Sequence, residues 1–181
     1  MAALTSEQQK LTWDLCRRRI TVEQFVAAAG IDPRQPGFAE RSLAKAIAGR
    51  EGRDFEAVLL LIGQFRLHVP NRAQIFAALL AERWHQKHED LAIALQLMRD
   101  PGTVEALARA ARSKFEYFYD ESHAFARKCC WALADIGTRA ARDRLRELAE
   151  CEDAEIRGYA QKRLDRWATE MPRKGPNADP P

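Results

Sequence analysis

Apolar residues recur at a near-fixed spacing over the last third of the sequence. Stripes of the first kind are Phe125, Cys129, Leu133, Ile136, then Ile156, Ala160, Leu164, Trp167, preceded by Leu91, Leu95, Met98. Stripes of the second kind lie between them: Val104, Ala108, Ala111, then Ala141, Leu145, Leu148. Steps of three and four residues indicate one helical face, and the alternation indicates helix pairs that bury their faces only against neighbouring pairs. We therefore expect an all-α fold, a short α-solenoid of stacked antiparallel helix pairs.

The rest of the sequence favours one domain with an irregular beginning. Short helical segments interrupted by the proline-containing stretch 32–36 fill residues 1–53, which we expect to form an N-terminal helical cap. Stronger helical periodicity begins at residue 54, so helix pairs are expected over 54–171 and a single domain over 1–171. Residues 172–181 are rich in Pro, Gly and Asn, which predicts a disordered tail.

Residues suited to helix ends support this division. Possible N-caps precede several helical patterns at Ser6, Thr21, Asn71, Thr103 and Thr138. Thr21 is followed three residues later by Gln24, the spacing of a capping box. Gly30 and Gly137 follow helical segments, where glycine readily adopts the left-handed conformation that ends a helix.

Composition excludes several classes of protein. The 29 basic and 26 acidic side chains are interspersed and leave a net charge of +3, which argues against a nucleic acid partner. No apolar run approaches the roughly 20 residues that cross a bilayer, and residues 1–10 are too polar for a secretion signal, so we expect a cytoplasmic protein without a membrane partner. The four cysteines form no CxxC pair, which favours reduced, buried thiols over disulfides or zinc.

One linker is longer than the repeat requires. Leu91 and Cys129 are 38 residues apart, whereas Cys129 and Ala160 are 31 apart, so about seven extra residues lie between these pairs. The extra segment, residues 115–121, is called the insert below. Its aromatic rings alternate with carboxylates, a composition suited to contact with a protein partner. The expected partner-binding residues are Glu116, Tyr117, Tyr119, Asp120 and Glu121. In the alternative interpretation, the rings fold back and fill the groove between helix pairs.

Catalytic and metal sites are not indicated. His85, His88 and Glu89 have the spacing at which two side chains of one helical face could hold a metal, but the corresponding position one repeat later is Arg127–Lys128, so no second ligand pair exists. The adjacent Cys129 and Cys130 sit in an apolar helical pattern. Neither a glycine-rich phosphate loop nor a Gly-x-Ser-x-Gly motif occurs. We expect no catalytic residue, no metal and no cofactor.

The repeat sequence resembles a known family. Residues 131–138 read Trp-Ala-Leu-Ala-Asp-Ile-Gly-Thr and are followed by Leu145, Leu148 and the run Glu152-Asp153-Ala154-Glu155-Ile156-Arg157. This pattern, over about residues 87–169, resembles bacterial HEAT-like repeats of the type first described in bilin lyases. The wider pattern, including Trp84-His85 and Asp100-Pro101-Gly102-Thr103, is similar to small bacterial HEAT-repeat proteins, some of which serve as toxin immunity proteins.

This resemblance implies a HEAT-like solenoid and a function in binding. The expected function is that of a non-enzymatic protein-binding module, a cytosolic immunity protein that neutralises a cognate bacterial toxin by direct binding. The alternatives are an enzyme of HEAT-like type, either a bilin-lyase relative or a DNA glycosylase, and an adaptor or scaffold subunit. The interspersed charges argue against the glycosylase, which needs a basic groove.

Overall fold

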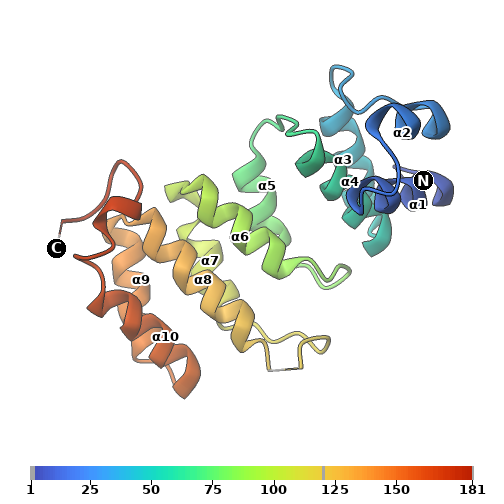
Figure 1. Cartoon of the computed structure of the whole chain (residues 1–181). Helices are drawn as coiled ribbons and strands as arrows, with labels where there is room; N and C mark the ends of the chain where they lie inside the picture. Colours follow the sequence, from blue (N-terminus) through green and yellow to red (C-terminus); the bar gives the residue numbers. More distant parts are fainter. Residues whose placement is uncertain (1–2, 120, 181) are drawn as a thin grey trace. The chain divides into compact units, whose positions relative to one another are not determined.

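The computed structural model describes residues 3–119 and 121–180, and these residues fold into ten α-helices without a strand (Figure 1). The helices are α1 (Ser6–Cys16), α2 (Val22–Ala29), α3 (Phe38–Gly49), α4 (Gly52–Gln64), α5 (Arg72–Leu79), α6 (His88–Met98), α7 (Val104–Ala110), α8 (His123–Ile136), α9 (Arg139–Ala149) and α10 (Ala154–Asp165). Short 3₁₀ turns span Pro101–Thr103 and Met171–Arg173. The prediction of an all-α fold is confirmed. In the described part of the chain, every helix is too short or too polar to cross a membrane.

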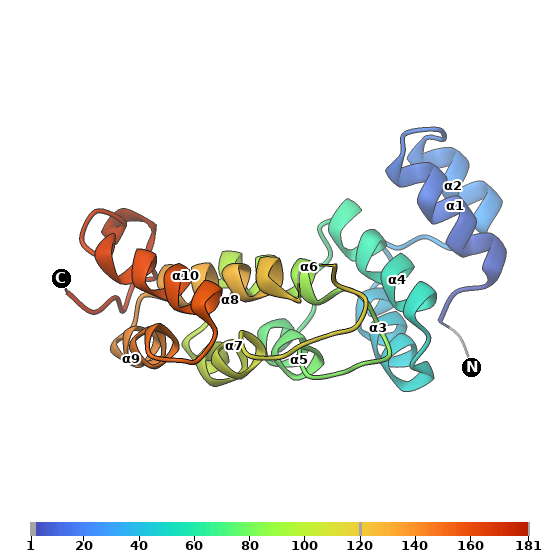
Figure 2. The ribbon, with the colours of Figure 1, turned by 90° about the horizontal axis from the view of Figure 1, so that it is seen from below.

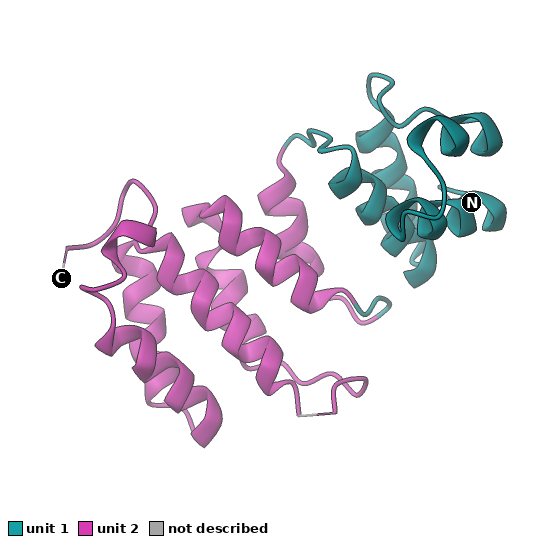
Figure 3. Ribbon diagram, viewed as in Figure 1, with its two compact units in different colours: residues 1–70, 84–86 teal, residues 71–83, 87–181 magenta. Residues whose placement is uncertain are grey.

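The helices divide into two compact units (Figure 3). Unit 1 contains residues 1–70 and 84–86 with α1 to α4, and unit 2 contains residues 71–83 and 87–181 with α5 to α10. The sequence-based boundary between cap and helix pairs, at residues 53 and 54, falls in the first turn of α4. In the structure α4 packs against α1 and α3, the helices of the expected cap.

Unit 1 has its own hydrophobic core. Helix α1 packs against α2 and α4, and α3 packs against α4. Phe25, Leu43, Phe55 and Leu61, one from each of α2 and α3 and two from α4, are fully or almost fully buried. The carboxylate of the buried Asp54 accepts hydrogen bonds from the backbone N–H groups of residues 3 and 4, at 2.7 and 2.9 Å, and so fixes the chain that leads into α1.

Unit 2 consists of two layers of helices (Figure 2). Helices α6, α8 and α10 lie side by side in one layer, and α5, α7 and α9 form the other. Each helix of the first layer contacts a helix of the second, through the pairs α5–α6, α7–α8 and α9–α10. Leu95, Leu107, Leu133 and Leu145 are completely buried between the layers. The alternating stripes of the sequence therefore correspond to alternate helices of the two layers.

Local sequence signals explain several helix ends. Thr21 and Gln24 form the expected capping box, with reciprocal side-chain to backbone hydrogen bonds. Gly137 ends α8 with a φ of 76°, and the Thr138 hydroxyl accepts the Ala141 N–H, as predicted. At α1, Thr5 forms the capping box, and the expected cap Ser6 is the first helical residue.

Two other expected caps lie at the predicted positions without capping through their side chains. Asn71 precedes α5 in a left-handed conformation with a φ of 52° and makes no side-chain cap. The Thr103 hydroxyl instead donates to the Asp100 carbonyl at 2.8 Å, because the chain forms a 3₁₀ turn before α7. The Asp100 carboxylate stabilises this turn by accepting from the Gly102 N–H at 2.8 Å.

Leu133 and Leu164 hold the same position in their two stripes but differ in burial. Leu133 is completely buried in α8, whereas Leu164 near the end of α10 is half-buried. The neighbouring Arg163 is buried and forms an ion pair with Glu170 at 2.8 Å. The other three residues of this stripe, Ile156, Ala160 and Trp167, are buried, so the departure is confined to Leu164.

The sequence predicts disorder for the C-terminal residues. In the structure, residues 172–180 pack on the end of α8, and Pro180 is the last described residue. The Lys174 ammonium group donates to the Ala134 carbonyl at 2.9 Å and lies 3.8 Å from the centre of the Trp167 ring. The N–H groups of Gly175 and Asp179 donate to the carbonyls of Asp135 and Gly137. The tail thus supplies partners for carbonyls that a helix end leaves without intrahelical donors.

Candidate functional site

The insert connects α7 to α8, and two contacts close its base. The Phe115 N–H donates to the hydroxyl of the buried Ser122 at 3.0 Å, and Lys114 Nζ donates to Glu121 Oε2 at 2.8 Å. Glu121 and Ser122 both adopt left-handed backbone conformations, with φ of 53° and 71°. These conformations are uncommon outside glycine, and the contacts at the base hold the two residues in them.

Three of the insert's four rings pack inward. Phe115 is buried, and its ring centre lies 3.8 Å from that of His88 in α6 and 5.8 Å from that of Phe125 in α8. The Phe118 ring stacks on Phe125 at 5.9 Å, and the Tyr117 ring lies 4.2 Å from Phe118. The aromatic cluster of Phe115, Tyr117, Phe118, Phe125 and His88 therefore joins the insert to α6 and α8. For these rings the structure agrees with the groove-filling interpretation.

His88 is the polar centre of this cluster. Its Nε2 lies 2.8 Å from the Glu82 carbonyl oxygen, and its Nδ1 lies 2.6 Å from the Tyr117 hydroxyl. A carbonyl can only accept, so Nε2 carries the proton, and in the neutral ring Nδ1 accepts from Tyr117. Burial raises the pKa of Tyr117 above its usual range, so this hydroxyl remains a donor.

Tyr119 differs from the other rings of the insert. This residue is fully exposed to solvent. Glu116 is exposed as well, and Glu121 is exposed beside Lys114, whose hydrogen bond lowers the pKa of the Glu121 carboxyl. Asp120, the fifth expected partner-binding residue, lies outside the described residues. The tip of the insert therefore presents one aromatic ring and the carboxylate of Glu116 to solvent.

From the sequence, side chains of the insert were predicted to bind a partner. The residues that hold the insert in position were not predicted. Ser122, Lys114 and Phe125 were not singled out as its supports, and His88 was considered only as a possible metal ligand. Alternating rings and carboxylates show that an aromatic segment is present. They do not show which rings turn inward, because the contacts come from helices far away in the sequence.

The three residues of the possible metal ligand set have separate partners. His85, in unit 1, is buried and packs against the rings of Phe55 and Trp84, at 5.0 and 4.9 Å. Both ring nitrogens of His88 are in hydrogen bonds. Glu89 forms an ion pair with Lys128 of α8 at 2.8 Å. Within the part of the chain that is described, no three His, Cys, Asp or Glu side chains come together as a metal site.

The cysteines occupy two kinds of environment. Cys129 and Cys130 are completely buried in α8; burial raises the pKa of Cys129 well above its usual range and that of Cys130 to about 12. Such thiols remain protonated and unreactive at neutral pH. Cys16 and Cys151 are partly exposed. His123, the nearest histidine in sequence to the buried pair, bonds to Asp153 at 3.0 Å through Nε2.

Comparison with known proteins leaves the family open. No family model matches the chain, and neither the curated proteins nor the solved structures contain a significant match.

Proposed function

We propose that this chain is a non-enzymatic protein-binding module and that the tip of the insert contacts its protein partner. The observation that carries the proposal is the complete exposure of Tyr119 on a segment whose other three rings are packed. The Tyr119 ring is therefore accessible to a partner without any rearrangement of the three packed rings. Tyrosine is among the residues that most often dominate the energy of a protein interface.

The packing of the insert supports a role in recognition. Phe115 and Phe118 attach it to α8, the Tyr117 hydroxyl bonds to His88, and Ser122 closes its base. Side chains that are packed before binding lose less conformational entropy when the partner arrives. Tyr119 would therefore act as a preorganised anchor.

The charge around this anchor suggests the character of the partner surface. Glu116 is exposed and makes no ion pair among the described residues. Glu121 is also exposed, although Lys114 offsets its charge. We infer that Tyr119 inserts into a shallow apolar pocket whose rim is basic, where such charges would favour the correct orientation and faster association.

The two helix layers of unit 2 are compatible with a short HEAT-like solenoid, and we propose that architecture for the repeats. Solenoids commonly serve as extended binding surfaces. The resemblance of residues 87–169 to small bacterial HEAT-repeat proteins leads to the most specific form of the proposal. In that form the partner is a toxin, and the chain is a cytosolic immunity protein that covers its active surface.

The partner can be identified in two ways. The full chain can be purified from its native cells with its associated proteins, and the product of the adjacent open reading frame can be tested for binding. Tyr119→Ala should then weaken binding to the purified partner about 30-fold in titration calorimetry, corresponding to about 2 kcal/mol. Leu97→Ala, which removes another exposed apolar side chain of unit 2, serves as the matched control. Equal affinity of Tyr119→Ala and the wild type would exclude the insert from the interface. A partner whose toxic activity stops upon binding supports neutralisation, whereas an unaffected activity would indicate an adaptor.

A further inference from the structure

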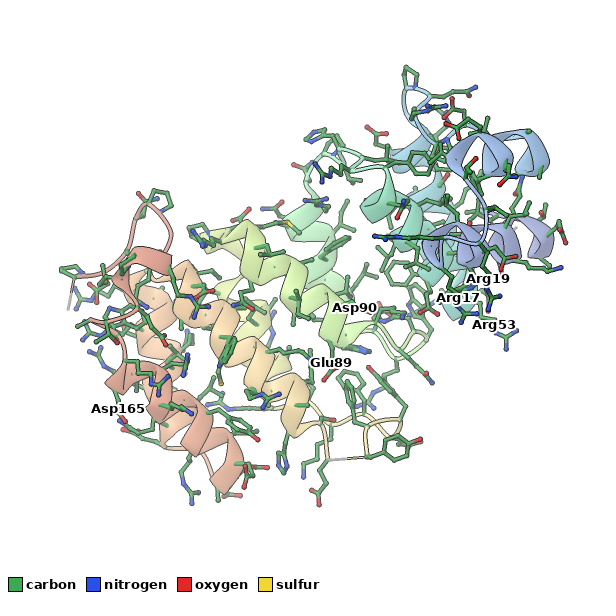
Figure 4. The ribbon with its side chains drawn as sticks, viewed as in Figure 1. Arg17, Arg19, Arg53, Glu89, Asp90 and Asp165 are labelled. Carbon is green, nitrogen blue, oxygen red and sulfur yellow. The ribbon has the colours of Figure 1, made fainter. Side chains whose placement is uncertain are left out.

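A hollow of about 560 Å³ lies in unit 1 between α1, the turn that follows it and the beginning of α4. Its lining residues are Ser6, Gln9, Lys10, Trp13, Asp14, Arg17, Arg19, Arg53 and Glu56. The spacing of residues 6, 9, 10, 13 and 17 places them on one face of α1 and its last turn. Figure 4 shows Arg17, Arg19 and Arg53 close together at this place. The volume is in the range of small-molecule sites, roughly 300 to 1,000 Å³.

The charges of the hollow are unbalanced. Four cationic side chains line it, with two carboxylates. Asp14 is already bound to Arg19, at 3.2 Å. Lys10, Arg17 and Arg53 make no ion pair with a carboxylate among the described residues, and all three side chains are exposed. A concave surface with several unpaired cations attracts anions, most strongly at low ionic strength.

Trp13 adds a planar wall to this cationic hollow. The ring is half-buried in α1, and the Arg17 guanidinium lies 5.7 Å from its centre. The indole N–H has no acceptor in the described part of the chain. Trp13, Lys10, Arg17 and Arg53 therefore offer hydrogen-bond donors from both helices, together with an aromatic surface on which a planar group can stack.

We propose that this hollow binds a nucleotide, with its phosphates held by Lys10, Arg17 and Arg53 and its base packed against Trp13. A phosphate group presents several oxygens and can accept from donors on separate elements, and arginine binds it with two parallel hydrogen bonds. A nucleobase stacks on tryptophan irrespective of its identity. Ser6 and Gln9 line the remaining wall and can hydrogen-bond the edge of the base. An acidic peptide would satisfy the arginines but would leave the indole without a planar partner.

The experiment uses the full chain, titrated in low salt with ATP, adenosine, inorganic tripolyphosphate and a hexaglutamate peptide. ATP should bind with a dissociation constant below 1 mM and quench tryptophan fluorescence. Adenosine and tripolyphosphate should each bind at least 10-fold more weakly, because each lacks one half of the ligand. Added salt should weaken the binding of ATP.

Variants separate the hollow from the general charge of the protein. Arg17→Gln with Arg53→Gln should weaken ATP binding at least 10-fold, and Trp13→Phe should reduce the quenching. Lys45→Gln on α3 removes an exposed cation of unit 1 that does not line the hollow, and it should bind ATP like the wild type. Circular dichroism establishes that each variant is folded.

Several results would overturn the assignment. They are absence of ATP binding at 1 mM, wild-type affinity of the double arginine variant, and an equal loss in Lys45→Gln. Tripolyphosphate that binds as tightly as ATP would exclude stacking on Trp13. Binding of hexaglutamate without binding of ATP would assign the hollow to an acidic protein segment instead.

Discussion

The Tyr117 hydroxyl lies 2.6 Å from Nδ1 of His88, in a pair that links the insert to the first turn of α6. His88 is completely buried, and its Nε2 bonds to the Glu82 carbonyl, so the imidazole has no access to water as a substitute partner. A buried nitrogen left without a partner is costly. Loss of the contact would leave Nδ1 of His88 buried without a hydrogen-bond partner. We therefore expect the contact to stabilise the folded insert.

Conservative changes of the two insert tyrosines test this relationship. Tyr117→Phe keeps the ring but removes the donor to His88, and it should lower the free energy of unfolding by about 1 to 3 kcal/mol. Tyr119→Phe changes a side chain that touches solvent only, so its effect should stay within about 0.5 kcal/mol. Urea unfolding of both variants provides the comparison. Equal effects would mean that Tyr117 is as free as Tyr119 in solution.

The fold class and several helix ends could be predicted from local sequence patterns. Thr21 with Gln24, and Gly137 with Thr138, act within one helical turn, so neighbouring residues determine them. The direction of the Tyr117 ring depends on His88, 29 residues away, and no periodicity encodes that contact. Leu164 fits the stripe in spacing but remains half-buried, although Ile156, Ala160 and Trp167 of the same stripe are buried, so spacing alone does not determine the burial of each position.

The hollow of unit 1 was equally inaccessible to sequence reasoning. Trp13 and Arg17 share a face of α1, and this could be read from their spacing. Arg53 joins them only because α4 packs against α1, which brings together residues 40 positions apart. The hollow therefore has an excess of cationic side chains, although basic and acidic residues are evenly mixed along the sequence.

Thiol accessibility provides a second prediction. Cys129 and Cys130 are buried and their pKa values are raised by burial, whereas Cys16 and Cys151 are partly exposed. In the native protein an aromatic disulfide reagent at pH 8 should modify at most two thiols, and in guanidinium it should modify all four. Mass spectrometry of the native product should find the label on Cys16 and Cys151. Rapid labelling of Cys130 in the native state would contradict the packing of α8.

The hydrogen bond between His123 and Asp153 predicts a dependence of stability on pH. The hydrogen bond from His123, followed by those from the Ile156 and Glu155 N–H groups, lowers the pKa of Asp153 from its usual 3.8. Ionised Asp153 therefore stabilises the fold above about pH 4, and this contribution is lost as the pH falls through the lowered pKa. Asp153→Asn retains an acceptor for capping α10 without a charge. The wild type should exceed this variant in stability at pH 5, and the difference should shrink by pH 3 in urea unfolding. A constant difference would mean that Asp153 acts only as a cap.

Two leucines of the repeat stripes should respond differently to truncation. Leu133 is completely buried, so Leu133→Ala should cost about 2 to 5 kcal/mol, the range for a core leucine. Leu164 is half-buried, and Leu164→Ala should cost clearly less. Chemical unfolding of both variants measures the two losses. A loss below about 1 kcal/mol for Leu133→Ala would show that the assigned packing of α8 is wrong.

The C-terminal tail gives the last prediction. Lys174, Gly175 and Asp179 bond to carbonyls at the end of α8, and the Trp167 indole N–H donates to the Asp179 carbonyl at 3.0 Å. Removal of residues 172–181 eliminates these bonds together and uncovers the Trp167 ring. At about 1 kcal/mol for each bond, the free energy of unfolding should fall by at least about 2 kcal/mol. Tryptophan emission should also shift to longer wavelength.

Lys174→Met is the matched control for this truncation. It retains an apolar chain beside Trp167 and removes the ammonium group, with its hydrogen bond to Ala134 and its contact with the Trp167 ring. It should cost less than the deletion, about 1 kcal/mol, since the backbone bonds of Gly175 and Asp179 remain. Truncation without a measurable loss of stability, and without a change in tryptophan emission, would mean that the tail is disordered in solution. The end of α8 would then depend on water and on the turn at Gly137 to satisfy its last carbonyl groups.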